Sequence, residues 1–213
     1  MINLTFLGGA GSIGASSTLV EVDGYTAVVD CGVRFTKQNP LPALDNLAGL
    51  SVDAIFVTHA HSDHTGGLPI LHSDYPAAPL YMTPPTMDLV RVLQADALKI
   101  MAAEEKESEL PLYNEQQVES MLRNIYPVHF YEKVTAGPLS ITYLPASHIL
   151  GAAMIHMETP YGNILFTGDF SVTPQKTVPG LQLPELKTDL LITETTYGNR
   201  LHSDRKAAEQ SLI

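Results

Sequence analysis

The stretch Thr58-His59-Ala60-His61-Ser62-Asp63-His64 decides how this chain of 213 residues is interpreted. It follows directly on Ala54-Ile55-Phe56-Val57, an apolar run of β-branched and aromatic residues that is typical of a buried strand. The histidines and the aspartate are therefore expected on a loop at a strand end, where four side chains within six residues can point at one spot. Imidazole and carboxylate groups suit zinc at neutral pH, whereas a structural zinc site would more commonly use cysteine. The pattern indicates a catalytic metal site.

Two further candidate metal ligands follow later predicted strands. His148 comes after the run Leu139–Leu144, and Asp169 comes after the run Asn163–Thr167. A lone histidine or aspartate at such a position is usually a surface residue or a turn former. Beside the loop at residues 59–64 the two become informative, because together with that loop they would complete a site for two metal ions.

The predicted elements are rich in strands, then helical, then rich in strands again. Strands are expected at 2–7, 18–22, 25–30, 54–58, 139–144, 152–158, 163–167 and 190–193. Apolar spacing predicts a helix over 87–101, and Asn114-x-x-Gln117 resembles a capping box that opens a second helix over 115–125. The pair Asp23-Gly24 predicts a tight hairpin. Residues 207–213 resemble the start of a helix, so we expect the sequence to be part of a longer protein.

A glycine pattern near the start imitates a nucleotide-binding motif. Gly9-x-Gly11-x-x-Gly14 follows a strand and has Asp30 further on, as in the dinucleotide-binding fingerprint. That fingerprint needs a helix directly after its glycines, because the helix N-terminus binds the pyrophosphate. Residues 16–22 instead alternate β-branched and polar residues and lead into the hairpin. We therefore interpret the glycines as a tight turn between two strands.

The balance of charges restricts the classes of partner. Twelve lysines and arginines against 23 aspartates and glutamates give a formal net charge of −11, the wrong sign for gripping nucleic acid by basic side chains alone. A polyanionic substrate would need positive charge from another source, such as bound metal ions. No apolar run is long enough to predict a transmembrane helix, and the first residues do not resemble a signal peptide. The single cysteine, Cys31, fits a reducing cytoplasm.

These motifs resemble those of the metallo-β-lactamase superfamily over nearly the whole chain. Asp30, the loop His59-x-His61-x-Asp63-His64, His148 and Asp169 match the first four motifs of the superfamily in order. The resemblance implies an α/β fold, the αββα sandwich, incomplete here at its C-terminal end. It also implies two metal ions at the loop ends of the sheets, with zinc as the expected ion and manganese or iron as alternatives.

The resemblance also assigns a role to each matched residue. By the match, the first metal is held by His59, His61 and His148, the second is held by Asp63 and His64, and Asp169 bridges the two. Asp30 matches a buried aspartate that braces the histidine loop without binding metal, as residues around a metal site commonly do.

The segment from Leu191 to Arg200 narrows the resemblance. Its core, Thr193-Glu194-Thr195-Thr196-Tyr197-Gly198, closely resembles a segment of the β-CASP branch of nucleic-acid nucleases. That branch includes ribonuclease J and the endonuclease subunit of the pre-mRNA cleavage and polyadenylation machinery. In it the segment closes the first part of the lactamase-like domain, so residues 1–198 are expected to form that part and 199–213 to begin an inserted β-CASP domain. Two later histidines of the branch have no counterpart here, which predicts an incomplete second metal site.

The resemblance implies a nuclease that hydrolyses phosphodiester bonds of RNA through a hydroxide activated by two zinc ions, with single-stranded DNA as the alternative substrate. Asp63 would orient the hydroxide, and Glu194 would orient a leaving-group acid located after residue 213. Two alternatives stay open: a small-molecule hydrolase of the same superfamily, such as a thioesterase or lactonase, and a non-catalytic scaffold. An unpaired sheet edge would favour self-association or a homodimer.

Three of the remaining four histidines are expected to serve no metal. His72 and His129 are assigned to the surface or the edge of the core, and His156, on a predicted strand, to the surface. His202 follows the Tyr197-Gly198 segment and is a less favoured candidate for the ligand that the second metal site lacks.

Overall fold

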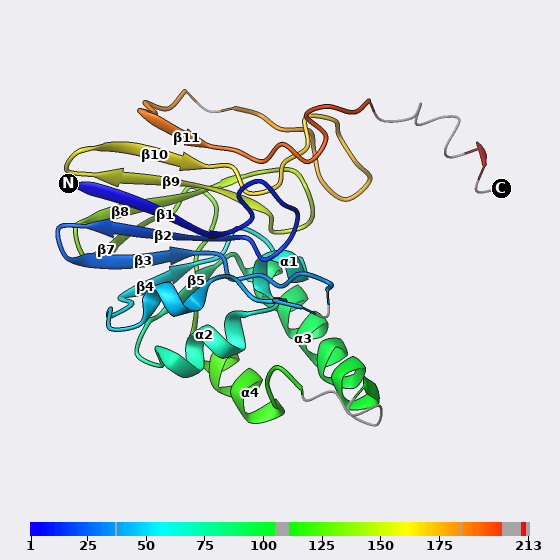
Figure 1. Cartoon of the computed structure of the whole chain (residues 1–213). Helices are drawn as coiled ribbons and strands as arrows, with labels where there is room; N and C mark the ends of the chain where they lie inside the picture. Colours follow the sequence, from blue (N-terminus) through cyan, green and yellow to red (C-terminus); the bar gives the residue numbers. More distant parts are fainter. Residues whose placement is uncertain (37, 105–110, 184, 202–209, 212–213) are drawn as a thin grey trace.

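Two sheets face each other in the computed structural model, which describes residues 1–36, 38–104, 111–183, 185–201 and 210–211 (Figure 1). The first sheet has six strands in the order β1 (Ile2–Gly8), β2 (Ser17–Val22), β3 (Tyr25–Val29), β4 (Ala54–Phe56), β5 (Leu80–Met82) and β6 (Ile125–Pro127). The second has five in the order β11 (Leu190–Ile192), β10 (Gly162–Phe166), β9 (Ala153–Thr159), β8 (Leu139–Pro145) and β7 (Lys133–Ala136).

The first two connections of the chain are both turns between antiparallel strands. Asp23 and Gly24 join β2 to β3 with φ angles of 51° and 82°, the positive values that a two-residue hairpin turn requires. Between β1 and β2, Gly9, Gly11 and Gly14 also have positive φ, and strand β2 follows them. The glycines therefore form a turn between strands, as predicted, and not a nucleotide-binding helix start.

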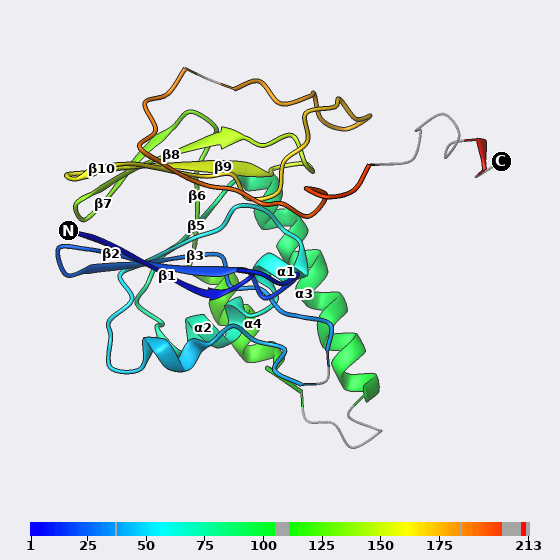
Figure 2. The same cartoon turned by 45° about the horizontal axis from the view of Figure 1, so that its top comes forward.

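An apolar core fills the space between the two sheets, which face each other in Figure 2. It includes buried Phe56 from the first sheet and buried Tyr143, Ile155 and Phe166 from the second. The helices lie on the other side of the first sheet, where a second apolar cluster forms around residues such as Leu68. They are η1 (Leu44–Leu47), α1 (Ser62–Thr65), α2 (Leu68–Asp74), α3 (Pro84–Glu104) and α4 (Glu115–Arg123).

Helix α4 begins with the predicted capping box. The side chain of Asn114 accepts a hydrogen bond from the backbone N–H of Gln117, and the side chain of Gln117 accepts one from the backbone N–H of Asn114. The helix ends at Arg123, because Ile125 enters strand β6. Helix α3 starts at Pro84, earlier than predicted, since proline is well tolerated in the first turn. None of the helices in the described part of the chain combines the length and apolar character needed to cross a bilayer.

The outer face of the second sheet is covered by the segment between β10 and β11 and not by helices of the described residues (Figure 2). Phe170, Leu181 and Leu186 of this segment pack against a cluster that includes buried Met154 and Leu144. The described residues therefore supply helix, sheet and sheet layers. The predicted α/β class with its two facing sheets is confirmed.

The strand order brings several strand ends to one edge of the sandwich. Strands β3 and β4 are parallel neighbours in the first sheet, and β10 and β11 are parallel neighbours in the second. The residues that follow each of these strands must therefore emerge at the carboxyl edge of its sheet. Loops outside the carboxyl ends of parallel strands are the usual place for ligand sites in α/β proteins.

Candidate metal centre

The backbone of residues 31–33 runs beside the histidine loop and fixes its shape. The N–H of Cys31 donates to the carbonyl oxygen of His64 (2.9 Å), and the N–H of Val33 donates to that of Ser62 (3.0 Å). Gly32 lies between them, and a Cβ atom at this position would overlap the carbonyl oxygen of Asp63. Only glycine permits this close approach, which explains the glycine at position 32.

A first group of four side chains converges at the edge of the sandwich. Ligand atoms of His59, His61, His148 and Asp169 all lie within 4.8 Å of one another. Nδ1 of His61 is 3.2 Å from Nε2 of His59 and 3.1 Å from Nε2 of His148. Tetrahedral zinc with Zn–N bonds of about 2.0–2.1 Å separates its ligands by about 3.3 Å. The four side chains therefore fit one zinc ion.

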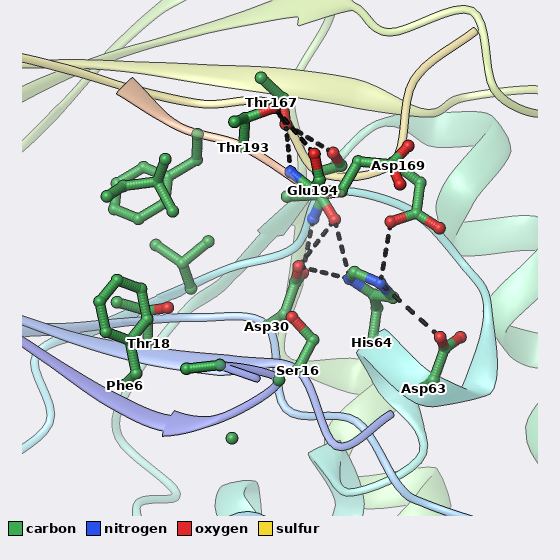
Figure 3. Close-up of a pocket in the computed structure, with 18 of the residues that line it drawn as sticks. Phe6, Ser16, Thr18, Asp30, Asp63, His64, Thr167, Asp169, Thr193 and Glu194 are labelled. Atoms are coloured by element: carbon green, nitrogen blue, oxygen red, sulfur yellow. Dashed lines mark hydrogen bonds and ion pairs between the residues drawn. The ribbon is translucent and has the colours of Figure 1, made fainter. Parts of the chain in front are cut away.

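Asp169 also belongs to a second group, which it forms with Asp63 and His64 (Figure 3). Nε2 of His64 is 3.4 Å from Oδ1 of Asp169 and 3.9 Å from Oδ2 of Asp63. The other oxygen of Asp169, Oδ2, is 3.7 Å from Nε2 of His148 in the first group. One imidazole and two carboxylates form a donor set that suits a second divalent ion. The structure thus brings together all six residues that the resemblance names as ligands.

Asp30 contacts the histidine loop through Thr58 and His64. It follows β3 with a φ of 60°, the left-handed region that residues other than glycine rarely adopt. Its buried carboxylate accepts hydrogen bonds from the backbone N–H (2.8 Å) and the hydroxyl (2.7 Å) of Thr58, and its Oδ2 is 2.8 Å from Nδ1 of His64. A carboxylate so occupied can hold the loop and orient a ligand imidazole.

Burial keeps two histidines of the first group in the neutral form that binds metal. Desolvation lowers the pKa of His59 well below its ordinary value, and the nearby imidazole of His64 lowers it further. Desolvation is also the largest cause of the lowered pKa of His61, followed by the charge of His148. Neutral imidazoles are therefore ready to bind metal without first losing a proton.

The second group behaves differently, because His64 lies between carboxylates. Burial alone would lower its pKa, but the Asp30 carboxylate and the hydrogen bond to Asp169 outweigh burial and raise the pKa of His64 to about 10. For Asp169 burial acts in the opposite direction and would raise the pKa of the carboxyl group. The hydrogen bond and the charge of His64 outweigh burial and lower this pKa to about 2. In the absence of metal the pair is an ion pair, so a metal at this position must displace the proton of His64.

Glu194 follows β11 and holds the backbone next to Asp169. Its Oε1 accepts a hydrogen bond from the N–H of Phe170 (3.3 Å), and its Oε2 accepts one from the N–H of Thr196 (3.2 Å). Its own N–H donates to the hydroxyl of Thr167 (3.4 Å). The carboxylate therefore reaches the loop that carries Asp169, which Figure 3 shows beside the second group.

A cavity of about 740 Å³ opens next to the second group. The glycine-rich turn at 8–14 lines one side and residues 193–196 line the other. Asp63, His64 and Asp169 belong to the same lining, together with apolar side chains such as Phe6 (Figure 3). A substrate in this cavity would lie against the second group of ligands.

The remaining histidines lie away from the two groups or outside the described residues. His72 is buried and its Nε2 is 3.0 Å from Oγ of Ser120. The expectation that His156 lies at the surface is wrong, because its side chain is buried and Nε2 is 3.1 Å from the carbonyl oxygen of Lys187. The segment between β10 and β11 covers it. His202 lies outside the described residues, as do most of residues 199–213.

Sequence reasoning missed Thr58, the last residue before the histidine loop. It is buried and makes two hydrogen bonds to Asp30. A threonine hydroxyl is not a zinc ligand, so no ligand pattern marks it. Its place between a predicted strand and His59 was the signal available.

Comparisons with known proteins agree with this geometry. The model of the family described as "Metallo-beta-lactamase superfamily" matches residues 11–208. The chain is 36% identical to a probable RNase, MJ4, of Methanocaldococcus jannaschii over 100% of the chain and 49% of the relative. It is 30% identical to the cleavage and polyadenylation specificity factor 73 of Drosophila melanogaster over 98% of the chain and 31% of that protein. It is 34% identical to the transcription termination factor FttA of Pyrococcus abyssi over 100% of the chain and 35% of that factor.

The chain thus spans about half the length of these relatives or less. Among solved structures, a subclass B3 metallo-β-lactamase from a soil metagenome library superposes with a TM-score of 0.58 at 18% identity, over 89% of this chain and 75% of the other. The Rm3 metallo-β-lactamase has a TM-score of 0.58 at 17% identity, over 90% and 74%. At this identity the two structures show a common fold. The family match and the relatives that cover the whole chain show that this protein belongs to the metallo-β-lactamase superfamily and, as residues 193–198 predict, to its β-CASP nuclease branch.

Proposed function

We propose that the protein is a metal-dependent hydrolase that cleaves phosphodiester bonds of RNA. The observation that carries this proposal is the pair of ligand groups that lie side by side and share the carboxylate of Asp169. Two adjacent divalent ions are a common solution for displacement at phosphorus. The names of the relatives, a probable RNase and a cleavage and polyadenylation factor, support RNA as the substrate.

We propose zinc as the native metal, because three imidazoles and one carboxylate oxygen at tetrahedral spacing suit this ion. His59, His61 and His148 would hold the first ion, Asp63 and His64 the second, and Asp169 would bridge them. When bound, two such ions lower the pKa of a water to near neutrality and clamp a phosphodiester oxygen. Their charge of about +4 also favours RNA binding by a chain with a net charge of −11.

The chain itself would position the reacting groups. The carboxylate of Asp63 is 30% exposed and lines the cavity, so that it can accept a hydrogen bond from an attacking water. Glu194 lines the same cavity and would orient a leaving-group acid supplied from outside residues 1–213. Asp30 would keep the histidine loop in place through Thr58 and His64.

Further parts of the proposal concern organisation in the cell. Residues 1–198 would form the first part of the lactamase-like domain, and 199–213 would begin an inserted domain. The edge strand β11 is paired only with β10 among the described strands and exposes 43% of Leu190 and 53% of Leu191, which supports self-association. The buried, unpaired thiol of Cys31 supports a reducing cytoplasm as the compartment.

The proposal is tested by hydrolysis assays with zinc-loaded protein, both for residues 1–213 and for any longer polypeptide that contains them. The substrates are a labelled single-stranded RNA, the same sequence as DNA, and a thioester. We expect RNA cleavage that disappears when a chelator is added and when His61 is replaced by alanine. Thioester hydrolysis without RNA or DNA cleavage would instead identify a small-molecule hydrolase. Metal binding without hydrolysis of any substrate by the longest polypeptide would identify a scaffold.

A further inference from the structure

Thr58 occupies the point where the two ligand groups and their supporting carboxylate meet. It is 1% exposed and follows strand β4. Its hydroxyl oxygen is 2.7 Å from Oδ2 of Asp30 and 3.1 Å from Nδ1 of His59. The imidazole of His59, the hydroxyl of Thr58 and the carboxylate of Asp30 therefore form a chain of hydrogen-bonding groups.

The chemistry of these groups decides the direction of the hydrogen bonds. Because an ionised carboxylate can only accept, the single hydroxyl proton of Thr58 goes to Asp30. The oxygen of Thr58 is then left to accept, so Nδ1 of His59 must carry the proton and donate it. His59 consequently keeps a free lone pair on Nε2, the atom that lies 3.2 Å from Nδ1 of His61 in the first ligand group.

His64 reaches the same carboxylate without an intermediary. Its Nδ1 is 2.8 Å from Oδ2 of Asp30, the oxygen that also accepts from Thr58. Its Nε2 faces Asp169 at 3.4 Å in the second ligand group. One oxygen of Asp30 thus orients an imidazole of each group, directly for His64 and through one hydroxyl for His59.

We propose that Thr58 is a positioning residue that fixes the proton of His59 on Nδ1 and ties the first metal site to Asp30. The inference rests on the proposed metal site and adds to it a side chain that binds no metal. A hydrogen-bonded partner on the second nitrogen of a ligand histidine fixes the ring and commonly strengthens metal affinity 10–100-fold. The link between His59 and Asp30 runs through the hydroxyl of Thr58. The backbone N–H of Thr58 bonds to the other oxygen of Asp30 and does not contribute to this link.

The test compares three variants of the protein for zinc affinity, measured by competition with a chromophoric chelator. Thr58→Val keeps the shape of the side chain and removes the hydroxyl, and we expect the tighter zinc to bind about tenfold more weakly. Thr58→Ser keeps the hydroxyl and should retain affinity near that of the wild type. Thr26→Val is the matched control, because Thr26 is a buried threonine at the opposite end of the sandwich, where β3 begins.

A second measurement is independent of the folding of any variant. In zinc-loaded wild-type protein with ¹⁵N-labelled histidine, long-range ¹H–¹⁵N spectra should show that His59 carries its proton on Nδ1 and binds zinc through Nε2. Binding of zinc through Nδ1 of His59 would overturn the proposal. Equal losses of affinity in Thr58→Val and Thr58→Ser, or in Thr58→Val and Thr26→Val, would also overturn it.

The outcomes separate this inference from the proposed function. Wild-type protein that binds no zinc would remove the metal centre itself, and with it the role of Thr58. Wild-type protein that binds zinc, together with a Thr58→Val variant of unchanged affinity and unchanged His59 spectrum, would remove only the role of Thr58.

Discussion

Oδ1 of Asp169 lies 3.4 Å from Nε2 of His64, while the other oxygen of the same carboxylate lies 3.9 Å from Nε2 of His59. A single side chain thus serves two groups of ligand atoms. The first group offers three imidazoles and a carboxylate oxygen, and the second offers one imidazole and two carboxylates. Because His64 must also lose a proton before it can bind metal, we expect the first group to bind zinc more tightly.

The first prediction concerns stoichiometry. Protein purified without chelator and dialysed extensively should retain about one zinc per chain, since three imidazoles and one carboxylate complete a tetrahedral site. Elemental analysis measures this directly. Protein without zinc, or with two equally tight zinc ions, would contradict the difference between the two groups.

The second prediction separates a ligand from its support. His61→Ala removes an atom that lies within 3.2 Å of two other ligand nitrogens, so the tighter zinc should be lost. Asp30→Ala removes no ligand. It should weaken zinc binding by about 10–100-fold, because Thr58 and the imidazole of His64 lose the carboxylate that orients them. Zinc titration of both variants measures the difference. Complete loss in both would identify Asp30 as a direct ligand.

The third prediction concerns Gly168, next to Asp169. Its φ is +52°, and a Cβ atom there would lie 2.7 Å from Cβ of Thr58. Gly168→Ala should therefore lower the free energy of unfolding by more than the ~1 kcal/mol that a positive φ costs an alanine, and should weaken zinc binding by displacing Asp169.

Gly49→Ala is the matched control for this substitution. Gly49 has a φ of +83°, and a Cβ atom added there would have no other atom within 4 Å, so only the backbone cost applies. Chemical denaturation and zinc titration should show a larger effect at 168 than at 49. Equal effects would mean that the contact with Thr58 is unimportant.

The fourth prediction follows from the buried His72. Burial lowers the pKa of its imidazole below the ordinary value of 6.5, so the unfolded chain takes up a proton that the folded chain refuses. This contribution to stability is complete above pH 6.5 and is lost as the pH falls toward the lower pKa of the folded state. Between pH 7 and 5, wild-type protein should lose stability more steeply than His72→Gln.

Urea denaturation at a series of pH values measures these slopes. The exposed His129 supplies the matched control, because His129→Gln leaves the buried imidazole of His72 in place and should keep the wild-type slope. A His72→Gln variant with the wild-type slope would show that His72 does not contribute.

The fifth prediction concerns Glu194. In a polypeptide that cleaves RNA, Glu194→Gln should slow cleavage by about 10²–10⁴-fold, the usual contribution of acid catalysis. The amide can also accept only one of the two backbone hydrogen bonds, from Phe170 and Thr196, that the carboxylate accepts. Zinc affinity, measured in parallel, separates the loss of acid catalysis from the loss of a backbone hydrogen bond next to Asp169. Only the second effect should weaken zinc binding. An unchanged cleavage rate would remove Glu194 from the site.

Much of the fold could be predicted because its signals are local. The hairpin at Asp23-Gly24 and the capping box of Asn114 and Gln117 each depend on a few neighbouring residues. Strands β5 and β6, with three residues each, gave no period to recognise. They form because parallel neighbours in the sheet supply their hydrogen bonds, which is a property of the assembled sheet and not of the segment.

The candidate site also contains residues that local sequence predicts and residues whose role only the fold reveals. Ligand residues such as His59 and Asp169 could be proposed from residue type and from their place after a strand. Thr58 could not, because its importance depends on the distances to Asp30 and His59 that only the folded chain establishes. The burial of His156 was missed for a related reason, since the residues that cover it lie about 30 positions further along the chain and bond through Lys187.

The segment that covers the second sheet has one more consequence. Because β10 and β11 are parallel, the chain must cross back over the sheet between them, so Asp169 lies where this crossover begins, and Glu194 lies beyond the strand to which it leads. Lengthening such a connection is inexpensive, about 0.6 kcal/mol for each doubling of its length. The exposed turn near Val172 can therefore accept inserted residues while strand pairing keeps both carboxylates in register. The length of this connection can thus change while the metal ligands stay in place.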